Sequence, residues 1–460
     1  MNIRLVNIKK LQVVILLLFL SEQLFCSCAS SVSDPNTTLK GNRQSSFQSD
    51  SVFLDYIQKA HINYLWKGAE PISGMAPERI HLDGVYPLND QNVVTTGGSG
   101  FGIAGLLVGI DRGFIPRHAG VLHLTKIVDF LAKADRFHGM WPHWIYGNTG
   151  KVKPFGQKDD GGDLVESSFL MEGLLCVRQY FRNGNTEEKQ LAEKIDVIWR
   201  QMEYNWYLHD QNVLYWHWSP NYGWEMNFPL QGYNECLIAY ILGASSPTYP
   251  IPASAYHEGW ARNGGIVSNA APYGIPLEVK HNGAEQYGGP LFWAHYSYIG
   301  LNPKGLKDQY TDYWNVTRNH ALTNYMYCVA NPKSFKGYSD SCWGLTASYS
   351  VTGYEAHMPM NNDKGVITPT AALSSFPYTP EESMRALKYF YFQLGDKLWG
   401  QYGFFDAFSI GENWYPKRYL AIDQCTIAPM IENYRSGLLW KLFMSCPEVQ
   451  DGLKKLGFNY

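Results

Sequence analysis

The sequence predicts an all-α protein, specifically an (α/α)6 barrel in which six helical hairpins close into a ring with long loops at one end. Three observations lead to this fold class. Apolar residues recur at helical spacing from residue 51 onward. No stretch alternates polar and apolar residues between turn pairs, as β-strands do. The connections between the expected helices alternate between short and long, so the long ones should gather at one end and carry the functional site.

Eleven segments show the helical pattern, and a short piece at 255–262 brings the number near twelve. In one of them a proline opens a run whose apolar residues, from Val121 to Leu131, share one face. The expected helices are 52–66, 95–110, 116–134, 164–181, 187–204, 229–242, 290–298, 310–329, 368–373, 380–394 and 429–444.

The long connections are rich in Gly, Trp, Tyr and His. They cover residues 137–158, 214–228, 262–289, 331–363 and 402–417, whereas the connections at Asp135 and at 183–185 are short. Long loops without secondary structure usually carry function in a compact domain.

Composition narrows the class of function. The 460 residues are 45% hydrophobic and only 17% charged, which fits a globular protein with a large core. The net charge of -3 supplies no basic field for nucleic acid. Aromatic residues reach 15%, and many of the 15 tryptophans stand beside Gly, Pro or His, a placement that suits stacking on sugar rings or bases. At least half of the aromatics should still be ordinary core residues.

The N-terminus has the pattern of an export signal. Basic residues precede a short apolar run at 11–20, which is too short to span a bilayer. The exit from this run resembles a lipobox with Cys28 as the lipidated residue. We therefore expect a lipoprotein-type signal peptide at 1–27, a flexible tether at 28–50 and a catalytic domain at 51–460. The protein would be an exported periplasmic or outer-membrane lipoprotein, monomeric, that meets the membrane only through its lipid.

Six cysteines follow Cys28, and none lies in a CxxC or CxxH pair, so no zinc site is expected. Several lie in apolar helical runs and resemble small buried hydrophobes. The sequence does not decide whether a disulfide such as Cys328–Cys342 forms.

The glycine-rich stretch 100–105 matches a dinucleotide-binding fingerprint in letters only. No strand precedes it and no βαβ unit surrounds it, so the context that the fingerprint requires is missing. Close packing between helices explains these glycines better than a nucleotide site does.

An acidic cluster surrounds a Gly-Gly break at 156–172. It contains Asp159, Asp160, Asp163 and Glu166, and the last two would face the same way on a helix. Asp163 is also a good N-cap, with Glu166 as the partner in a capping box. The two interpretations are compatible, because a cap can face a cleft.

Glu235 follows a tryptophan-rich loop at 215–220 and is expected to begin a helix. Burial under tryptophans would raise its pKa and keep a proton on it, as a general acid requires. The alternative is a first-turn acid that only complements the helix dipole.

Several long motifs resemble a known family. Residues 414–424 (WYPKRYLAIDQ), 430–440 (MIENYRSGLLW), 368–383 (TPTAALSSFPYTPEES) and 402–409 (YGFFDAFS), together with DDGGDLVE at 159–166, resemble the glucoamylase-like (α/α)6 hydrolases. The chain is most similar to glycoside hydrolase family 144, whose members act on β-1,2-glucans from within the chain or release sophorose from an end. The sequence departs from the expected pattern at 424–426, which puts the local loop geometry in doubt.

The resemblance implies an inverting hydrolysis without metal or cofactor. Glu235 aligns with the essential acid and would be the general acid. Asp163 and Glu166 match the family's acidic cluster, and either Asp423 or one member of the Asp163/Glu166 pair would activate the water. An inverting pair needs one protonated and one ionised carboxyl across a site wide enough for water. Acidic, aromatic and histidine residues of the loops are expected to bind substrate: Asp159, Asp160, Trp141, His143, Trp216, Trp218, Tyr233, Trp293, Asp406, Trp414 and Glu432.

Two other classes compete with a hydrolase. A non-catalytic glycan-binding surface lipoprotein would fit the lipobox and the aromatics, but binding a neutral sugar does not need four clustered acids. A polysaccharide lyase would need Arg and Lys to neutralise an acidic polymer, and no basic cluster lines the long loops.

Overall fold

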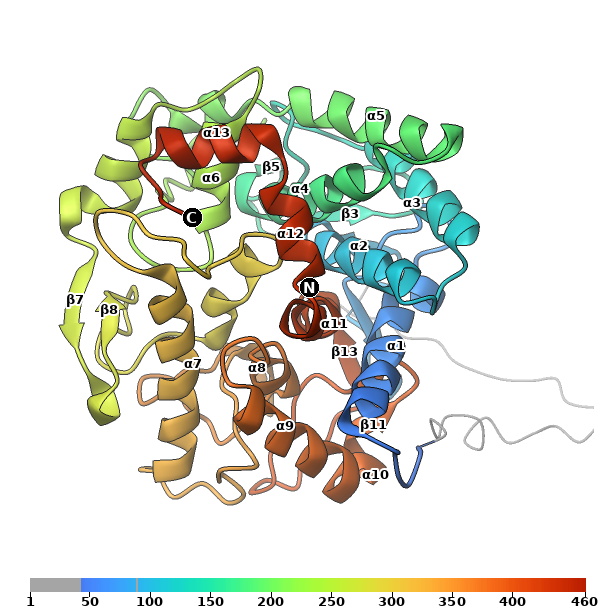
Figure 1. Ribbon diagram of the computed structural model, residues 1–460, viewed down its shortest axis with the longest axis vertical. Coiled ribbons are helices and arrows are strands. Elements are labelled where there is room, and N and C mark those ends of the chain that lie inside the picture. Colours follow the sequence, from blue (N-terminus) through green and yellow to red (C-terminus); the bar gives the residue numbers. More distant parts are fainter. Residues whose placement is uncertain (1–42, 88–89) are drawn as a thin grey trace, which may run out of the picture. The chain divides into compact units, whose positions relative to one another are not determined.

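The computed structural model describes residues 43–87 and 90–460, and the chain over this range is mostly helical (Figure 1). The expected signal peptide and Cys28 lie outside the described residues. Among the described residues, no helix combines the length and hydropathy that crossing a bilayer requires.

The helices agree with most of the expected segments. The α-helices are α1 Asp50–Gly68, α2 Thr96–Asp111, α3 Arg117–Leu131, α4 Leu164–Phe181, α5 Thr186–Arg200, α6 Leu237–Ser245, α7 Tyr313–Ala330, α8 Pro369–Leu373, α9 Pro380–Lys388, α10 Gly395–Leu398, α11 Ala421–Arg435, α12 Leu438–Met444 and α13 Pro447–Lys455. Shorter 3-10 or π turns are η1 Tyr204–Leu208, η2 Ala255–Trp260, η3 Arg262–Gly264, η4 Pro272–Gly274, η5 Leu291–Ala294, η6 Tyr296–Tyr298 and η7 Tyr389–Gln393.

Three expected helices differ from the structure. The segment 290–298 forms only the short 3-10 turns η5 and η6. The segment 229–242 is helical only from Leu237, because Pro229 starts an extended stretch and not a helix. The segment 429–444 is two helices, and the first begins at Ala421, so Pro429 lies inside α11. Proline is common at a helix start, but an interior one is tolerated where packing compensates for the lost backbone hydrogen bond.

Short strands were not expected, and they connect the loops. They are β1 Arg79–His81, β2 Val93–Thr95, β3 Trp144–Tyr146, β4 Val152–Lys153, β5 Gly162–Asp163, β6 His217–Trp218, β7 Val267–Ala270, β8 Leu277–Val279, β9 Ala347–Ser350, β10 Gly353–Ala356, β11 Trp399–Gly400, β12 Gly403–Phe404 and β13 Arg418–Leu420. Their antiparallel pairs are β1–β13, β2–β3–β4, β5–β6, β7–β8, β9–β10 and β11–β12. Strands this short give no period-two signal.

Helix α11, which Figure 1 shows nearly end-on, packs against α1, α2, α8 and α12. Helix α11 contacts α2 and α8, α2 contacts α4, and α4 contacts α6. The first helix of each early hairpin packs outside this series, since α1 contacts α2 and α3 contacts α5. Three strands run directly into these inner helices: β2 into α2, β5 into α4 and β13 into α11. The N-terminal ends of inner helices therefore meet the long loops.

The glycine stretch at 100–105 lies inside α2 and packs against α4, as expected. A Cβ added at Gly100 would stand 2.4 Å from the carbonyl oxygen of Phe169, and one added at Gly173 would stand 2.2 Å from the carbonyl oxygen of Gly100. The two backbones approach so closely that a side chain has no room, which is a packing role and not nucleotide binding.

Residues 43–49, expected to belong to the tether, are part of the folded unit. Arg43 donates a hydrogen bond to the carbonyl of Tyr391 at 2.8 Å, and the ring of Phe47 stacks on that of Phe53 at 4.5 Å. The cysteines at 176, 236, 328, 342, 425 and 446 are buried and free, so the pair Cys328 and Cys342 forms no disulfide.

Candidate active site

One cavity of about 320 Å³ collects the acids and aromatics of the long loops. It lies where inner helices begin, because Thr95 is the N-cap of α2 and Glu166 is in the first turn of α4. Its lining residues are Glu78, Arg79, Thr95, His143, Trp144, Phe155, Glu166, Phe169, Trp216, Glu235, Phe292, Tyr296, Tyr349, Tyr354, Leu420 and Ile422. Of the expected site residues, His143, Glu166, Trp216 and Glu235 line it directly.

Glu235 lies in the turn before α6, two residues ahead of the helix. It is 8% exposed, and its backbone carbonyl accepts a hydrogen bond from the hydroxyl of Ser297. Burial raises the pKa of Glu235 to about 7, and the negative charges of Glu166 and Asp163 act in the same direction. Burial is the largest of these effects and outweighs a backbone hydrogen bond that favours the charged form.

Asp163 is the N-cap of α4. Its Oδ1 accepts hydrogen bonds from the backbone N–H groups of Val165 at 3.0 Å and Glu166 at 2.9 Å, and from the indole of Trp216 at 2.9 Å. The residue is fully buried. Burial raises its pKa, but the hydrogen bond from His143 and the charge of His217 outweigh burial and hold the pKa below its usual value. Asp163 is thus an ionised group that positions its neighbours, with no side-chain oxygen facing the cavity.

Glu166 does not complete a capping box. Its Oε2 instead accepts a hydrogen bond from the backbone N–H of Gly97, in the first turn of α2, at 2.7 Å. Burial raises the pKa of Glu166 to about 7; His143 opposes this shift and Asp163 adds to it. Glu166 and Glu235 line the same cavity with similar pKa values, and each disfavours ionisation of the other because like charges repel.

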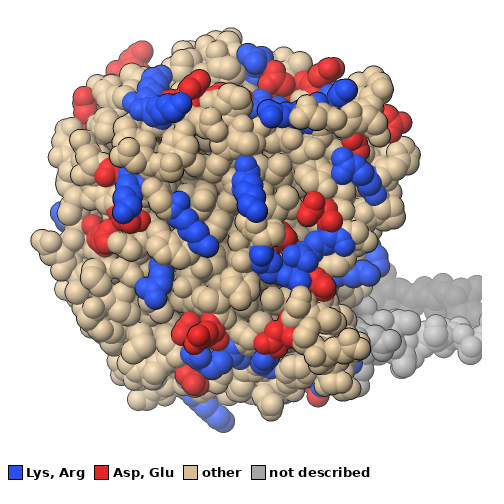
Figure 2. Space-filling view, in the orientation of Figure 1, with Lys and Arg blue, Asp and Glu red and all other residues tan. Residues whose placement is uncertain are grey.

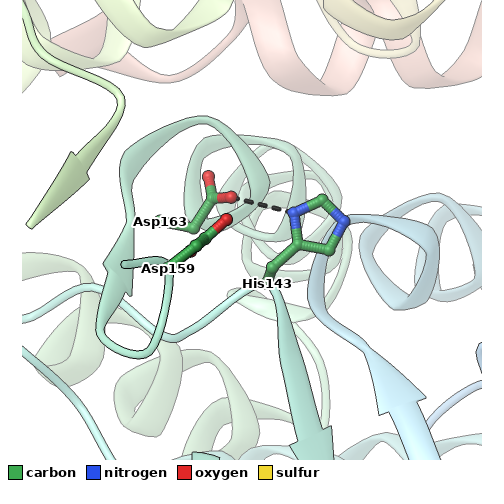
Figure 3. Close-up of side chains that lie close together, drawn as sticks. All are labelled: His143, Asp159 and Asp163. Carbon is green, nitrogen blue, oxygen red and sulfur yellow. Dashed lines mark hydrogen bonds and ion pairs between the residues drawn. The ribbon is translucent and has the colours of Figure 1, made fainter. Parts of the chain in front are cut away.

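His143 joins this acidic group (Figure 3). Its Nδ1 is 2.9 Å from Asp163 Oδ2, and Asp159 lies beside the pair. Burial lowers the pKa of His143, but Glu166, Asp163 and Asp159 outweigh burial and raise it to about 9. A protonated imidazole therefore balances the surrounding carboxylates at neutral pH.

The same three side chains offer ligand atoms that all lie within 4.8 Å of one another, a spacing at which a metal ion could be held. His217 borders them, with its Nδ1 3.2 Å from Asp159 Oδ1. The high pKa of His143 means that a proton competes with any metal for this place, since a metal ligand must be deprotonated.

Asp406 and Asp423 form a carboxyl pair behind the cavity wall. Tyr349 donates its backbone N–H to Asp406 Oδ2 at 2.8 Å, and Tyr296 donates its hydroxyl to Asp423 Oδ1 at 3.4 Å. Burial and the charge of Asp406 raise the pKa of Asp423 well above its usual value, and burial raises that of Asp406 to about 6. Burial and like charge therefore disfavour ionisation of both carboxyls together.

Several expected substrate-binding residues lie elsewhere. Trp141 is fully buried and donates its indole N–H to the carbonyl of Leu131 at 3.0 Å. Tyr233 is fully buried against Trp293, which is itself 9% exposed. Glu432, on the far side of α11, forms an ion pair with Arg112. None of these four residues lines the cavity, because the fold turns them inward or pairs them elsewhere, which sequence composition does not reveal.

Three more expected residues lie outside the cavity lining. Asp160 accepts hydrogen bonds from Ser219 and, at 2.6 Å, from Asn221, so it organises the loop 219–222. Trp414 packs against a small buried cluster that includes Tyr349. The ring of Trp218, in β6, lies 6.1 Å from the ring of Trp206.

Glu78 and Arg79 were missed, although both line the cavity. Their side chains form an ion pair, yet burial raises the pKa of Glu78 above its usual value. Arg79 also lies 5.7 Å from the ring centre of Trp144. In the sequence these two charged residues stand between the apolar residues Ala76 and Ile80, outside any helical pattern. Such a pair is only a weak sign of a functional site.

This chain resembles known proteins in sequence and in structure. The Glycoamylase family model matches residues 227–447. The chain is 44% identical over 428 residues to the exo β-1,2-glucooligosaccharide sophorohydrolase of Parabacteroides distasonis. That match covers 88% of the chain but only 58% of the relative's length.

Solved structures agree over most of the chain. The endo-β-1,2-glucanase of Chitinophaga pinensis, solved with sophorotriose and glucose, is 63% identical with a TM-score of 0.89, covering 90% of this chain and 99% of that one. An endo-β-1,2-glucanase from Talaromyces funiculosus has a TM-score of 0.65 at 12% identity, covering 88% of this chain and 90% of that one. The second likeness concerns the fold alone.

Proposed function

Since the chain belongs to the glucoamylase-like family that includes the bacterial β-1,2-glucanases, we propose that it hydrolyses β-1,2-linked glucan. The observation that carries this proposal is the pair Glu166 and Glu235, which line one cavity with pKa values of about 7. Glycoside hydrolysis uses one carboxylic acid and one carboxylate on the two sides of the scissile bond.

Glu235 acts as the general acid in this proposal. Burial keeps a proton on it near neutral pH, so it can protonate the glycosidic oxygen as the bond to the anomeric carbon breaks. The proton moves to the leaving sugar's hydroxyl, and Glu235 is left ionised.

Glu166 activates the water. Its carboxylate faces the cavity and is held by Gly97, whereas Asp163 has its oxygens committed to α4, Trp216 and His143. Asp423 is the other candidate base, but it does not line the cavity: it accepts a hydrogen bond from Tyr296, and its neighbour Asp406 accepts one from Tyr349. That pair instead holds the two tyrosines that line the cavity. Attack by water opposite the leaving group gives inversion at the anomeric carbon.

Aromatic walls suit a neutral sugar chain. Trp144, Phe155, Trp216 and Tyr354 line the cavity, and Phe155 and Tyr354 are 51% and 57% exposed. On the face shown in Figure 2, acidic and basic side chains are interspersed without a large patch of one sign. These features support a neutral glucan over an acidic polymer or a nucleic acid.

Cleavage within the glucan chain is the favoured mode. The endo-acting relative from Chitinophaga pinensis matches this chain at higher identity than the exo-acting relative from Parabacteroides distasonis does, 63% against 44%. The match also covers 99% of the former and 58% of the latter. A purely glycan-binding role is not favoured by these relatives.

We also infer that the inner helices close an (α/α)6 ring. Its hairpins would be α1–α2, α3–α4, α5–α6, the turns η2 with η5 and η6, α7–α8 and α9–α11. The contact of α11 with α2 supports closure.

Incubation with linear β-1,2-glucan, with β-1,3-, β-1,4- and α-1,4-glucans as controls, tests the function. We expect new reducing ends from the β-1,2-glucan alone, with rapid loss of polymer length and with an inverted anomer first seen by NMR. The same rate with and without EDTA is expected, because no step needs a metal. Turnover only of the control glucans would contradict the substrate, and release of sophorose alone would contradict endo action.

A further inference from the structure

A second cluster of aromatic rings lies outside the catalytic cavity. It consists of His138, Trp206, His209 and Trp224, which we call the outer platform. Three of these rings, Trp206, His209 and Trp224, line a separate cavity of about 320 Å³ together with Glu203, Asn205, Asp210 and Tyr249. None of the roles described so far uses this cavity.

Stacking contacts fix the orientation of these rings, while part of their surface stays exposed to solvent. His138 stacks on Trp206 with ring centres 3.7 Å apart and planes 10° apart, and its Nδ1 lies 3.0 Å from Glu203 Oε2. His209 stacks on Trp224 at 4.7 Å. Trp206 nevertheless stays 40% exposed. Exposing an aromatic face to water is unfavourable in free energy. A ring that is both fixed and exposed therefore favours a ligand that packs on it.

Polar groups around the rings define the class of ligand. Glu203, Asn205 and Asp210 offer carboxylate and amide oxygens, and the described residues that line this cavity include no lysine or arginine. Such a lining repels anions and accepts hydrogen bonds from hydroxyl groups, while the aromatic faces take up apolar C–H surface. A neutral chain of sugars presents both kinds of surface.

The outer platform is built on the same loops as the active site. The connection between α3 and α4 supplies both His138 and His143, and the connection between α5 and α6 supplies Trp206, Trp224, Trp216 and Glu235. Trp218 links the two sites. Its ring lies 6.1 Å from Trp206, its backbone pairs with Gly162 in β5, and its neighbour His217 contacts Asp159.

We propose that the outer platform binds a segment of β-1,2-glucan that extends beyond the catalytic cavity, so that it holds the polymer without taking part in bond cleavage. This inference rests on the proposed function. It commits to a neutral glucan as the occupant. Because the two cavities share no lining residue, it also predicts that the platform distinguishes long chains from short ones.

Trp206→Ala tests the proposal. We expect the KM for long β-1,2-glucan to rise roughly five- to ten-fold, the size expected from truncating one aromatic anchor, while the KM for a β-1,2-linked trisaccharide changes less than about two-fold. Native electrophoresis in gels that contain β-1,2-glucan, run with both proteins in a Glu235→Gln background to prevent digestion, should show weaker retardation of the Trp206→Ala protein.

Two further variants guard against loss of folding. Trp206→Phe keeps an aromatic face and should retain most of the polymer affinity. Val197→Ala removes an apolar side chain that is 56% exposed on α5 and should leave both KM values unchanged. Melting temperatures of all three should agree within a few degrees.

The outcomes separate the two proposals. If wild-type protein releases no reducing ends from β-1,2-glucan, the proposed function has failed, whatever Trp206→Ala does. If wild-type protein hydrolyses the polymer and Trp206→Ala matches it in KM for both substrates and in gel retardation, the outer platform is overturned and the proposed function stands. An equal rise of both KM values would also contradict the platform, because it would mean that Trp206 affects substrate binding in the catalytic cavity.

Discussion

The carboxylate of Glu166, in α4, accepts a hydrogen bond at 2.7 Å from the backbone N–H of Gly97, in the first turn of α2. This contact joins two inner helices at the cavity and fixes the orientation of one of its acids. A helix N-terminus favours a negative charge nearby, yet burial is the larger effect, and the pKa of Glu166 rises to about 7.

Gly97→Ala should disturb this acid directly. A Cβ at this position would lie 2.5 Å from Glu166 Oε2, so the carboxylate must move away. Because a displacement of about 1 Å in a catalytic group can cost on the order of 10²-fold in rate, we expect kcat to fall by about that factor. Gly105→Ala in the same helix is the control, since its nearest neighbours stand 3.9 Å away. Equal activity of the two variants would contradict the role of Glu166.

Glu235→Gln should reduce turnover of β-1,2-glucan by roughly 10²–10⁴-fold, the usual effect of losing acid-base help. In wild-type protein, activity should fall as the pH rises through about 7, because Glu235 then loses the proton that it donates. Initial rates across pH 5 to 9 measure both effects. Glu225→Gln changes a 58% exposed carboxyl and should behave as wild type.

The same substitution should affect stability in a pH-dependent way. The folded-state pKa of Glu235 is about 7, above the ordinary 4.5, so the stability that its protonated form contributes is full below about pH 4.5 and is lost as the pH rises through 7. Glutamine stays neutral, and so Glu235→Gln should gain on wild type in melting temperature between pH 5 and pH 8. If the difference in melting temperature between Glu235→Gln and wild type does not change with pH, Glu235 does not have a raised pKa in the folded protein.

Asp163→Asn separates capping from electrostatics. Asparagine caps a helix about as well as aspartate, so α4 should keep its start. The amide, however, gives His143 no carboxylate to bind, and the pKa of His143 should drop from about 9 towards its ordinary 6.5. NMR titration of the imidazole measures this shift. We expect turnover to fall at least ten-fold at pH 8, and full activity there would make Asp163 a cap only.

Gly100→Ala and Gly105→Ala form a matched pair in α2. Alanine favours an isolated helix by about 1 kcal/mol over glycine. At Gly100 the new Cβ would lie 2.4 Å from the backbone of α4, so we expect a net loss of roughly 2–4 kcal/mol in unfolding free energy. At Gly105 nothing comes closer than 3.9 Å, and stability should hold or rise. Denaturant titration compares them, and equal loss at both sites would argue against close helix packing.

Lipid anchoring through Cys28 is a further proposal, because this residue lies outside the described part of the chain. Cys28→Ala should release the protein from the membrane fraction, since a single short apolar run does not replace the lipid. Immunoblots of membrane and soluble fractions test this. Membrane association equal to that of wild type would contradict the anchor.

The sequence determined much of the local structure. Helical periodicity placed α1 to α5 within a few residues, although α5 ends at Arg200, four residues earlier than expected. The Asp-x-x-Glu pattern identified the cap of α4. The same pattern could not say where Glu166 points, because its partner Gly97 is 69 residues away. Likewise, Pro429 was taken for a helix start, since nothing local shows that α11 already runs through it.

The choice among similar residues was made only by the tertiary structure. Trp141 and Trp216 both lie in loops rich in aromatic residues, and the sequence does not distinguish them. Trp141 is nevertheless fully buried in the core, whereas Trp216 lines the cavity. Asp406 and Asp423 become a buried carboxyl pair, and Glu78 becomes a cavity acid, only when distant segments meet. Local periodicity and capping depend on neighbours within a few residues, so the sequence fixes them. Burial, pairing and pKa depend on what the rest of the chain brings alongside, and so they are decided only by the folded protein.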